Sequence, residues 1–229
     1  MQYFPKPVRF VAAILGLFLV ELAAGNAEAP SLPAHAGQLA QTQHTARMES
    51  AQAARLQRIM TPLIRHMDRP IPLDQVKIGL LDDPNINAAN AGGGEFYVTT
   101  GLLQQANDDQ LRAILAHEAA HADLGHVAKS QALATGLGLG IELFNRVFPG
   151  YGALTPIAGQ LVANGYSRTE ESEADAHGVT ILRRAGYDGK TLMANTLAWL
   201  KQSGGGSGGG FLATHPSTDD RIEAIQRLP

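Results

Sequence analysis

The chain has 229 residues, a formal net charge of -3 and no cysteine. Its 45% apolar and 17% charged residues are typical of a globular protein with one substantial hydrophobic core. The charge argues against a nucleic-acid partner, and the absence of cysteine excludes disulfides, thiolate metal sites and cysteine nucleophiles. Any metal site must therefore use nitrogen and oxygen ligands.

The N-terminal segment has the pattern of a secretory signal peptide. Lys6 and Arg9 precede an apolar run over residues 10–20, and small residues up to Ala29 offer a cleavage site. A short membrane anchor is the alternative, although the run is about half of what spans a bilayer. We therefore expect residues 1–29 to be a signal peptide and the protein to be exported, with the periplasm as its destination.

We expect one domain over residues 38–229, preceded by a leader over residues 30–37. β-branched and aromatic residues predict strands at 76–81 and 95–100. Before them, apolar residues at helical spacing predict an amphipathic helix that ends ahead of Pro70; they are Leu56, Ile59, Met60, Leu63, Ile64 and Met67.

The second half of the domain is predicted to be helical. Asn107 and Gln110 form a capping-box pattern at the start of a helix. The glycine-rich segment 203–210 is predicted to be a flexible loop, and no Gly-Lys-Ser or Gly-Lys-Thr follows it to bind phosphate. Further helices are predicted over residues 127–148, 167–184, 191–201 and 220–228.

The motif His117-Glu118-Ala119-Ala120-His121 points to metal chemistry. In a helix, residues four apart lie about 40° from each other around the axis, so both imidazoles project from one face and can bind one zinc ion. Glu118 stands beside that metal position and can take a proton from an activated water. We therefore assign His117 and His121 as ligands and Glu118 as the general base.

A catalytic zinc site needs a third protein ligand. His126 is rejected for this position, because in a continuing helix it points about 140° away from His121, as a surface or second-layer histidine would. In the helix over residues 167–184, Glu171 and Asp175 lie on the apolar stripe, where carboxylates need a cation or a donor. We assign Glu171 as the third ligand and Asp175 as the group that orients a ligand histidine.

Several segments together resemble the zinc metallopeptidases of the HtpX, BepA and CAAX-prenyl-protease type. The matching segments are residues 87–103, His117 to His121, Ser167 to Asp175, and Thr214-His215-Pro216 with Arg221. The resemblance implies one Zn²⁺ per chain and a gluzincin-like α+β fold that is mostly α-helical with a small antiparallel sheet.

The resemblance also implies roles for residues outside the zinc helix. The strand around Phe96, Tyr97 and Val98 would be a sheet edge to which an extended substrate peptide adds as a further strand. His215 and Arg221 would lie over the metal and stabilise the oxyanion, or His215 would occupy the open metal position in a resting state.

These features predict a zinc-dependent endopeptidase that cleaves unfolded or misassembled envelope proteins. The expected partner is a polypeptide, with a possible link to the envelope membrane or its assembly machinery. One alternative is a chaperone-like envelope protein that contains zinc but rarely cleaves. The other is a structural zinc domain in which His215 is a permanent fourth ligand.

Overall fold

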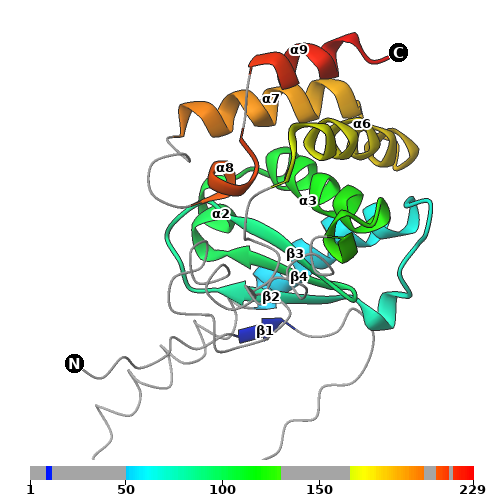
Figure 1. The fold of residues 1–229 in the computed structure, drawn as a ribbon. Helices are drawn as coiled ribbons and strands as arrows, with labels where there is room; N and C mark the ends of the chain where they lie inside the picture. The colour runs from blue at the N-terminus through cyan, green and yellow to red at the C-terminus, as the bar shows by residue number, and fades with distance from the viewer. Residues whose placement is uncertain (1–8, 12–49, 130–165, 204–209, 217–218) are drawn as a thin grey trace, which may run out of the picture.

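The computed structural model describes residues 9–11, 50–129, 166–203, 210–216 and 219–229. Four strands form one sheet, and helices are layered on one side of it (Figure 1). Helix α3 (Asp108–Asp123) contacts the strand β3 (Ala88–Gly92) as well as α6 (Arg168–Arg184) and α7 (Gly189–Gln202). Helix α3 is therefore the central element, with the sheet on one side and helices on the other.

The sheet has the order β1-β2-β4-β3. Its other strands are β1 (Arg9–Val11), β2 (Lys77–Leu81) and β4 (Glu95–Thr99). Strands β3 and β4 form an antiparallel hairpin, and β4 then lies between β3 and β2 and runs parallel to β2. The predicted small sheet is thus present, but it is mixed instead of antiparallel, because the chain inserts a hairpin before it returns beside β2.

The prediction that the strand around Phe96, Tyr97 and Val98 is a sheet edge is wrong. Strand β4 is paired on both sides, with Ile78 of β2 opposite Phe96 and Ala89 of β3 opposite Tyr97. The three side chains are 1%, 3% and 0% exposed, so they belong to the core. In the described sheet, the edge next to α3 is β3.

The described helices agree closely with the sequence pattern. Residues 50–65 are helical, and both α3 and α6 begin with complete capping boxes, from Asn107 with Gln110 and from Ser167 with Glu170. Helices α7 and α9 (Asp219–Arg227) lie where helices were expected. Not predicted were β3, the 3-10 helix η1 (Leu73–Gln75), and the short helices α2 (Thr100–Gln105) and α8 (Phe211–Thr214).

Several predictions fall mainly outside the described residues. These concern the signal peptide over 1–29 apart from the backbone of β1, the leader over 30–37, and most of the glycine-rich loop 203–210. Of the helix expected over 127–148, only residues 127–129 are described, and they are helical. Among the described helices, none has both the length and the apolar content needed to cross a membrane.

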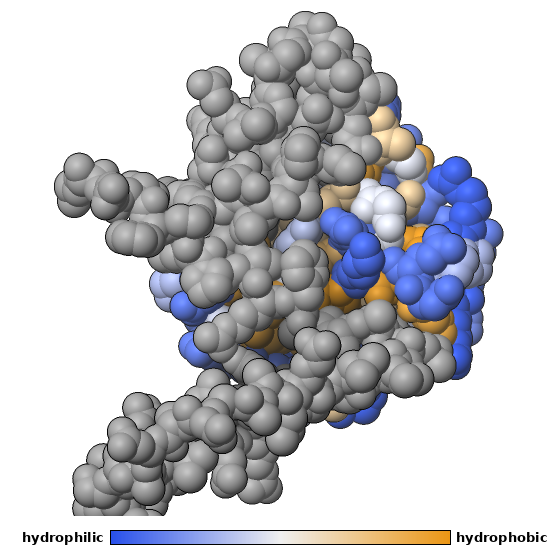
Figure 2. Space-filling view, turned by 90° about the horizontal axis from the view of Figure 1, so that it is seen from below, coloured by the Kyte–Doolittle hydropathy of each residue, from blue (hydrophilic) through white to orange (hydrophobic). Residues whose placement is uncertain are grey.

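Small residues let α3 and α6 approach closely. A methyl group added at Gly178 of α6 would lie 3.4 Å from the backbone oxygen of Ala116 of α3 and 2.8 Å from Cε of Met193. On the other faces of α3, large apolar side chains from the 50–65 helix, the sheet and α7 complete one core. The view from below shows mainly hydrophilic residues on the rim of the described part, with hydrophobic residues between them (Figure 2).

At the C-terminal end of α3, one buried carboxylate ties three segments together. Asp123 accepts hydrogen bonds from the backbone N–H groups of Asp68 and Arg69, at 2.6 and 2.8 Å. The Nε2 atom of His177 in α6 lies 2.7 Å from Asp123 Oδ2. This cluster joins α3, α6 and the segment that follows the 50–65 helix.

We predict that Asp123→Ala lowers the free energy of unfolding by about 2–4 kcal/mol, because it removes the acceptor of two part-buried backbone N–H groups and the partner of His177. Urea denaturation in the presence of a chelator measures this without a contribution from bound metal. The control is Glu223→Ala, which removes a carboxylate that is 63% exposed and pairs with Arg227. The control is expected to change stability by less than about 0.5 kcal/mol, and equal effects of the two substitutions would contradict the role of Asp123.

Candidate metal centre

Helix α3 carries the motif His117 to His121 into the interior of the protein. His117, Glu118 and His121 are only 2%, 1% and 0% exposed. Their neighbours on α3 are leucine, isoleucine and alanine residues of the core, so the motif interrupts an apolar stripe. Burial of three polar side chains in such surroundings requires partners for them.

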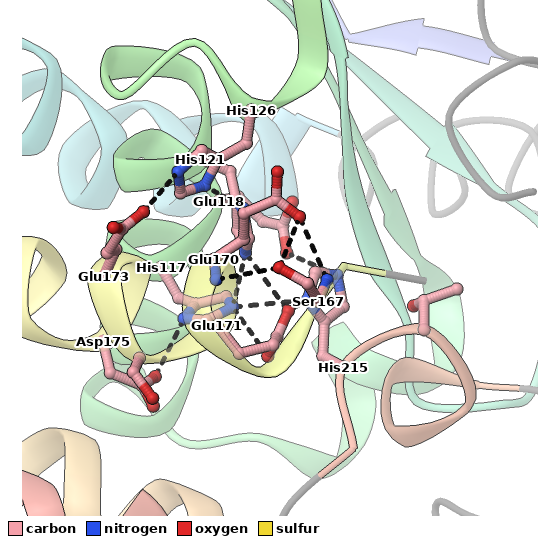
Figure 3. Close-up of polar contacts among 12 residues, drawn as sticks. His117, Glu118, His121, His126, Ser167, Glu170, Glu171, Glu173, Asp175 and His215 are labelled. Atoms are coloured by element: carbon pink, nitrogen blue, oxygen red, sulfur yellow. Dashed lines mark hydrogen bonds and ion pairs between the residues drawn. The ribbon is translucent and has the colours of Figure 1, made fainter. Parts of the chain in front are cut away.

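Helix α6 supplies those partners. Glu171 and Asp175 are each 2% exposed and face α3, on the apolar stripe that the sequence indicated. Glu171 Oε2 lies 3.6 Å from Nε2 of His117, and Glu171 Oε1 lies 3.4 Å from Nε2 of His121. The structure thus brings the three predicted ligands together (Figure 3).

His215, which follows α8, contributes a fourth donor atom. Its Nδ1 atom lies 3.2 Å from Nε2 of His117 and 2.8 Å from Glu171 Oε1. The ring is 2% exposed and stacks on Phe211, with ring centroids 4.5 Å apart. Four residues each place one donor atom within 4.8 Å of the donor atoms of the other three. They are His117, His121, Glu171 and His215.

The spacing of these donors fits a metal ion. Zinc bound tetrahedrally at its usual bond lengths separates its ligand atoms by about 3.3 Å. The Nε2 atoms of His117 and His121 are 3.0 Å apart, and the other separations given above run from 2.8 to 3.6 Å. Two nitrogen lone pairs that face each other at this distance repel, so an ion or a proton must lie between them.

The charges around the donors also favour a bound cation. Glu118, Glu171 and Asp175 are buried carboxylates, and Arg221 is the buried cation beside them within the described part of the chain. With neutral histidines, two negative charges remain uncompensated in a region closed to water. A divalent cation balances that charge, and without one such burial is very costly.

Glu118 is held by the sheet edge. Its Oε2 atom accepts a hydrogen bond from the backbone N–H of Asn90 in β3 at 3.0 Å, and the Asn90 amide donates to the Glu118 backbone oxygen at 3.3 Å. Its Oε1 atom has no hydrogen-bond donor among the described residues and lies 3.4 Å from Nε2 of His215. Burial raises the pKa of Glu118, which brings a carboxylate closer to the range in which a general base works.

Asp175 and Arg221 form a support behind His117. Asp175 Oδ1 lies 3.0 Å from Nδ1 of His117, which leaves Nε2 of that ring for the metal. The Arg221 guanidinium donates to both oxygens of Asp175 at 2.7 Å, to the Pro216 backbone oxygen at 2.8 Å, and pairs with Glu171 at 2.5 Å. Burial disfavours ionised Asp175, but Arg221 and His117 outweigh it and lower the pKa of Asp175.

Two side chains of the site were not identified as parts of it from the sequence. Tyr166 stacks on the His121 ring, with centroids 3.7 Å apart and planes at 22°, and its position directly before the Ser167 cap was its only sequence signal. Burial raises the pKa of Tyr166 well above its usual value. His126, which the sequence left as a surface or second-layer residue, is 5% exposed with its Nδ1 3.0 Å from Nδ1 of His121.

Known proteins contain related sequences. A bovine protein named "Metalloendopeptidase OMA1, mitochondrial" is 32% identical over 173 residues, covering 66% of this chain and 32% of that protein. A Vibrio cholerae protein named "Putative beta-barrel assembly-enhancing protease" is 30% identical over 169 residues, covering 62% of this chain and 32% of its own length. "Metalloprotease YcaL" of Escherichia coli is 28% identical over 155 residues, covering 62% of this chain and 58% of that protein.

The chain spans about a third of the length of the first two of these relatives. The family model named "Peptidase family M48" matches residues 50–228, which include α3, α6 and His215. Because that match covers well over half of the sequence, the chain belongs to peptidase family M48, a family of metallopeptidases.

Proposed function

We propose that the protein is a zinc-dependent endopeptidase. The observation that carries this proposal is the convergence of His117, His121, Glu171 and His215 on one buried position, beside the unpaired oxygen of Glu118 among the described residues. Nitrogen and carboxylate donors at tetrahedral spacing suit zinc, which needs no cysteine. Zinc held there supplies Lewis acidity, which polarises a scissile carbonyl and activates water.

The side chains divide the remaining work. Glu118 takes a proton from the attacking water at Oε1 and transfers it to the leaving amine. Asn90 orients the Glu118 carboxylate through its backbone N–H. His215, whose Nε2 is 3.4 Å from Glu118, is positioned to stabilise developing negative charge when its ring turns away from the metal donors. Arg221 acts as a positioning residue, because its guanidinium already pairs with Asp175 and Glu171.

We further propose that an extended substrate adds to β3, the edge of the described sheet beside the base. The backbone oxygen of Asn87 accepts from the Thr99 N–H, so Asn87 and Ala89 face β4 and the alternate residues Ala88 and Asn90 face away from it. The N–H of Asn90 indeed reaches Glu118 in α3. A substrate paired with this edge would lie next to Glu118.

The proposed substrates are unfolded or misassembled proteins of the cell envelope. A substrate that adds as a strand needs an extended backbone, and its main-chain hydrogen bonds depend little on the type of side chain. Unfolded chains meet both conditions. The predicted signal peptide supports a periplasmic or membrane-associated location, and one relative is named for β-barrel assembly. A folded substrate would not present a free strand to β3.

One observation favours the chaperone-like alternative. His215 completes the group of donors, and with all four atoms on one ion no place remains for water. A protein locked in that state would bind clients without cleaving them. Rescue of a client by Glu118→Gln as effective as rescue by the wild type would favour this alternative over proteolysis.

We predict that Glu118→Gln reduces cleavage of an unfolded casein by about 10²–10⁴-fold, because the amide cannot accept the proton of the attacking water. The variant is expected to keep its zinc, since Glu118 is not among the ligands, and metal analysis of the purified protein checks this. Glu223→Gln on α9 is the control and should cleave at the wild-type rate. Retained cleavage by Glu118→Gln would refute the assignment of the base.

The proposal of an added strand predicts an alternating response to backbone methylation of a peptide substrate. In a strand, successive N–H groups point to opposite sides, so only every second one can pair with β3. N-methylation at one set of alternating positions should raise KM strongly, and at the other set it should have little effect. A uniform response along the peptide would contradict binding as a strand.

A further inference from the structure

A second chain of polar contacts begins behind His121, on the opposite side of the site from Asp175. The Nδ1 atoms of His121 and His126 are 3.0 Å apart, and Nε2 of His126 lies 3.2 Å from Oε2 of Glu173 (Figure 3). His126 is 5% exposed, whereas the Glu173 side chain is 55% exposed. The contacts therefore run from the metal centre to the surface.

The end of α3 explains how His126 reaches this position. Helix α3 ends at Asp123, and Gly125 takes a positive φ of 76°, which reverses the chain before the next helical residues begin at 126. The expectation that His126 points away from His121 assumed a continuous helix. The turn at Gly125 removes that condition and brings the His126 ring against His121.

The tautomers follow from the partners. Glu173 is an acceptor, so Nε2 of His126 carries the proton and donates it to the carboxylate. Nδ1 of His126 is then an acceptor, and it receives the N–H of Nδ1 of His121. With its proton fixed on Nδ1, His121 presents the lone pair of Nε2 to the position where Nε2 of His117 also points, 3.0 Å away.

His117 and His121 are thus supported by different means. For His117 the partner is Asp175, a buried carboxylate that is itself fixed by Arg221. For His121 the partner is a neutral imidazole, and the carboxylate is one residue further out at Glu173. Tyr166 stacks on the face of the His121 ring, whereas the Nδ1 atom of that ring meets His126.

We propose that His126 and Glu173 are positioning residues for His121, which fix its tautomer and orientation toward the metal. Nδ1 of His126 accepts a hydrogen bond from the Nδ1–H of His121, and Glu173 in turn fixes the tautomer of His126. This inference rests on the metal site of the proposed function and is independent of the substrate. It adds to the site two residues that bind no metal and touch no substrate.

The test measures metal binding by the full chain without substrate. Zn²⁺ affinity is determined by competition with a chromophoric chelator, and ligand geometry is followed by the absorption spectrum of the Co²⁺-substituted protein. His126→Phe keeps a ring but has no acceptor, and it is expected to weaken Zn²⁺ binding by about 10–100-fold and to alter the Co²⁺ spectrum. His126→Asn places an amide oxygen near the position of Nδ1 and is expected to restore most of the affinity.

Glu173 provides an independent arm, because its exposed side chain can be replaced without disturbing the core. Glu173→Ala is expected to lower the Zn²⁺ affinity by a few fold in the wild type and to have no further effect in the His126→Asn variant, which lacks the Nε2 donor. Glu223→Ala on α9 is the matched surface control and should leave the affinity unchanged.

Two results would overturn the proposal. One is an unchanged Zn²⁺ affinity in His126→Phe. The other is an equal loss in His126→Phe and His126→Asn, since this would mean that packing and not the acceptor matters. Should the wild type itself bind no metal, the proposed function fails before this inference is reached. If His126→Phe does not fold, the comparison of Glu173→Ala with Glu223→Ala still decides, and equal affinities of those two variants reject the proposal.

Discussion

The arrangement of this protein depends on buried negative charge between α3 and α6. Glu118 lies on one helix, and Glu171 and Asp175 lie on the other, all within a region from which water is excluded. Arg221 compensates part of this charge and leaves room for a divalent cation. Carboxylates in such a place repel one another, and a cation between the two helices relieves that repulsion. A metal ion bound there would therefore stabilise the folded domain.

The elements around the two helices support this arrangement. The small residues Gly178 and Ala116 allow the helix backbones to approach, and Asp123 at the end of α3 contacts His177 in the middle of α6. The residues that follow α8 bring His215 to the donors, and α9 brings Arg221 to Asp175. The donor cluster is thus assembled from segments that are distant in sequence, and its geometry depends on the packing of the whole C-terminal half.

Much of the candidate site could be predicted from helix periodicity in the sequence. The spacing of His117 and His121, and the presence of Glu171 and Asp175 on an apolar stripe, require only that each segment be helical, and both segments have strong caps. Strand β3 escaped prediction because alanine, asparagine and glycine have little strand propensity, and pairing with β4 determines its conformation. The expectation that β4 is an edge came from the family resemblance and did not take the pairing with β3 into account.

Contacts between distant segments also limited the prediction. His126 is turned by a glycine at the end of α3, and Tyr166 meets His121 from another part of the chain, so neither contact follows from local spacing. The same holds for Arg221, whose place beside two carboxylates depends on how α9 packs on α6 and α7. The periodicity of one helix gives the direction of a side chain but not the partner that it meets.

The hydrogen bond from Asn90 to Glu118 has a consequence for how the sequence of this protein can vary. The donor is a backbone N–H, so this bond does not depend on the type of side chain at position 90. The buried Asn90 side chain has separate bonds, to the Glu118 backbone oxygen and from the Gly92 N–H. The contact instead depends on the register of the hairpin, because a slip by one residue turns that N–H to the opposite side. Insertions or deletions around the glycines at 92–94 would therefore displace the donor N–H, whereas a replacement of the side chain at residue 90 leaves the donor N–H itself in the chain.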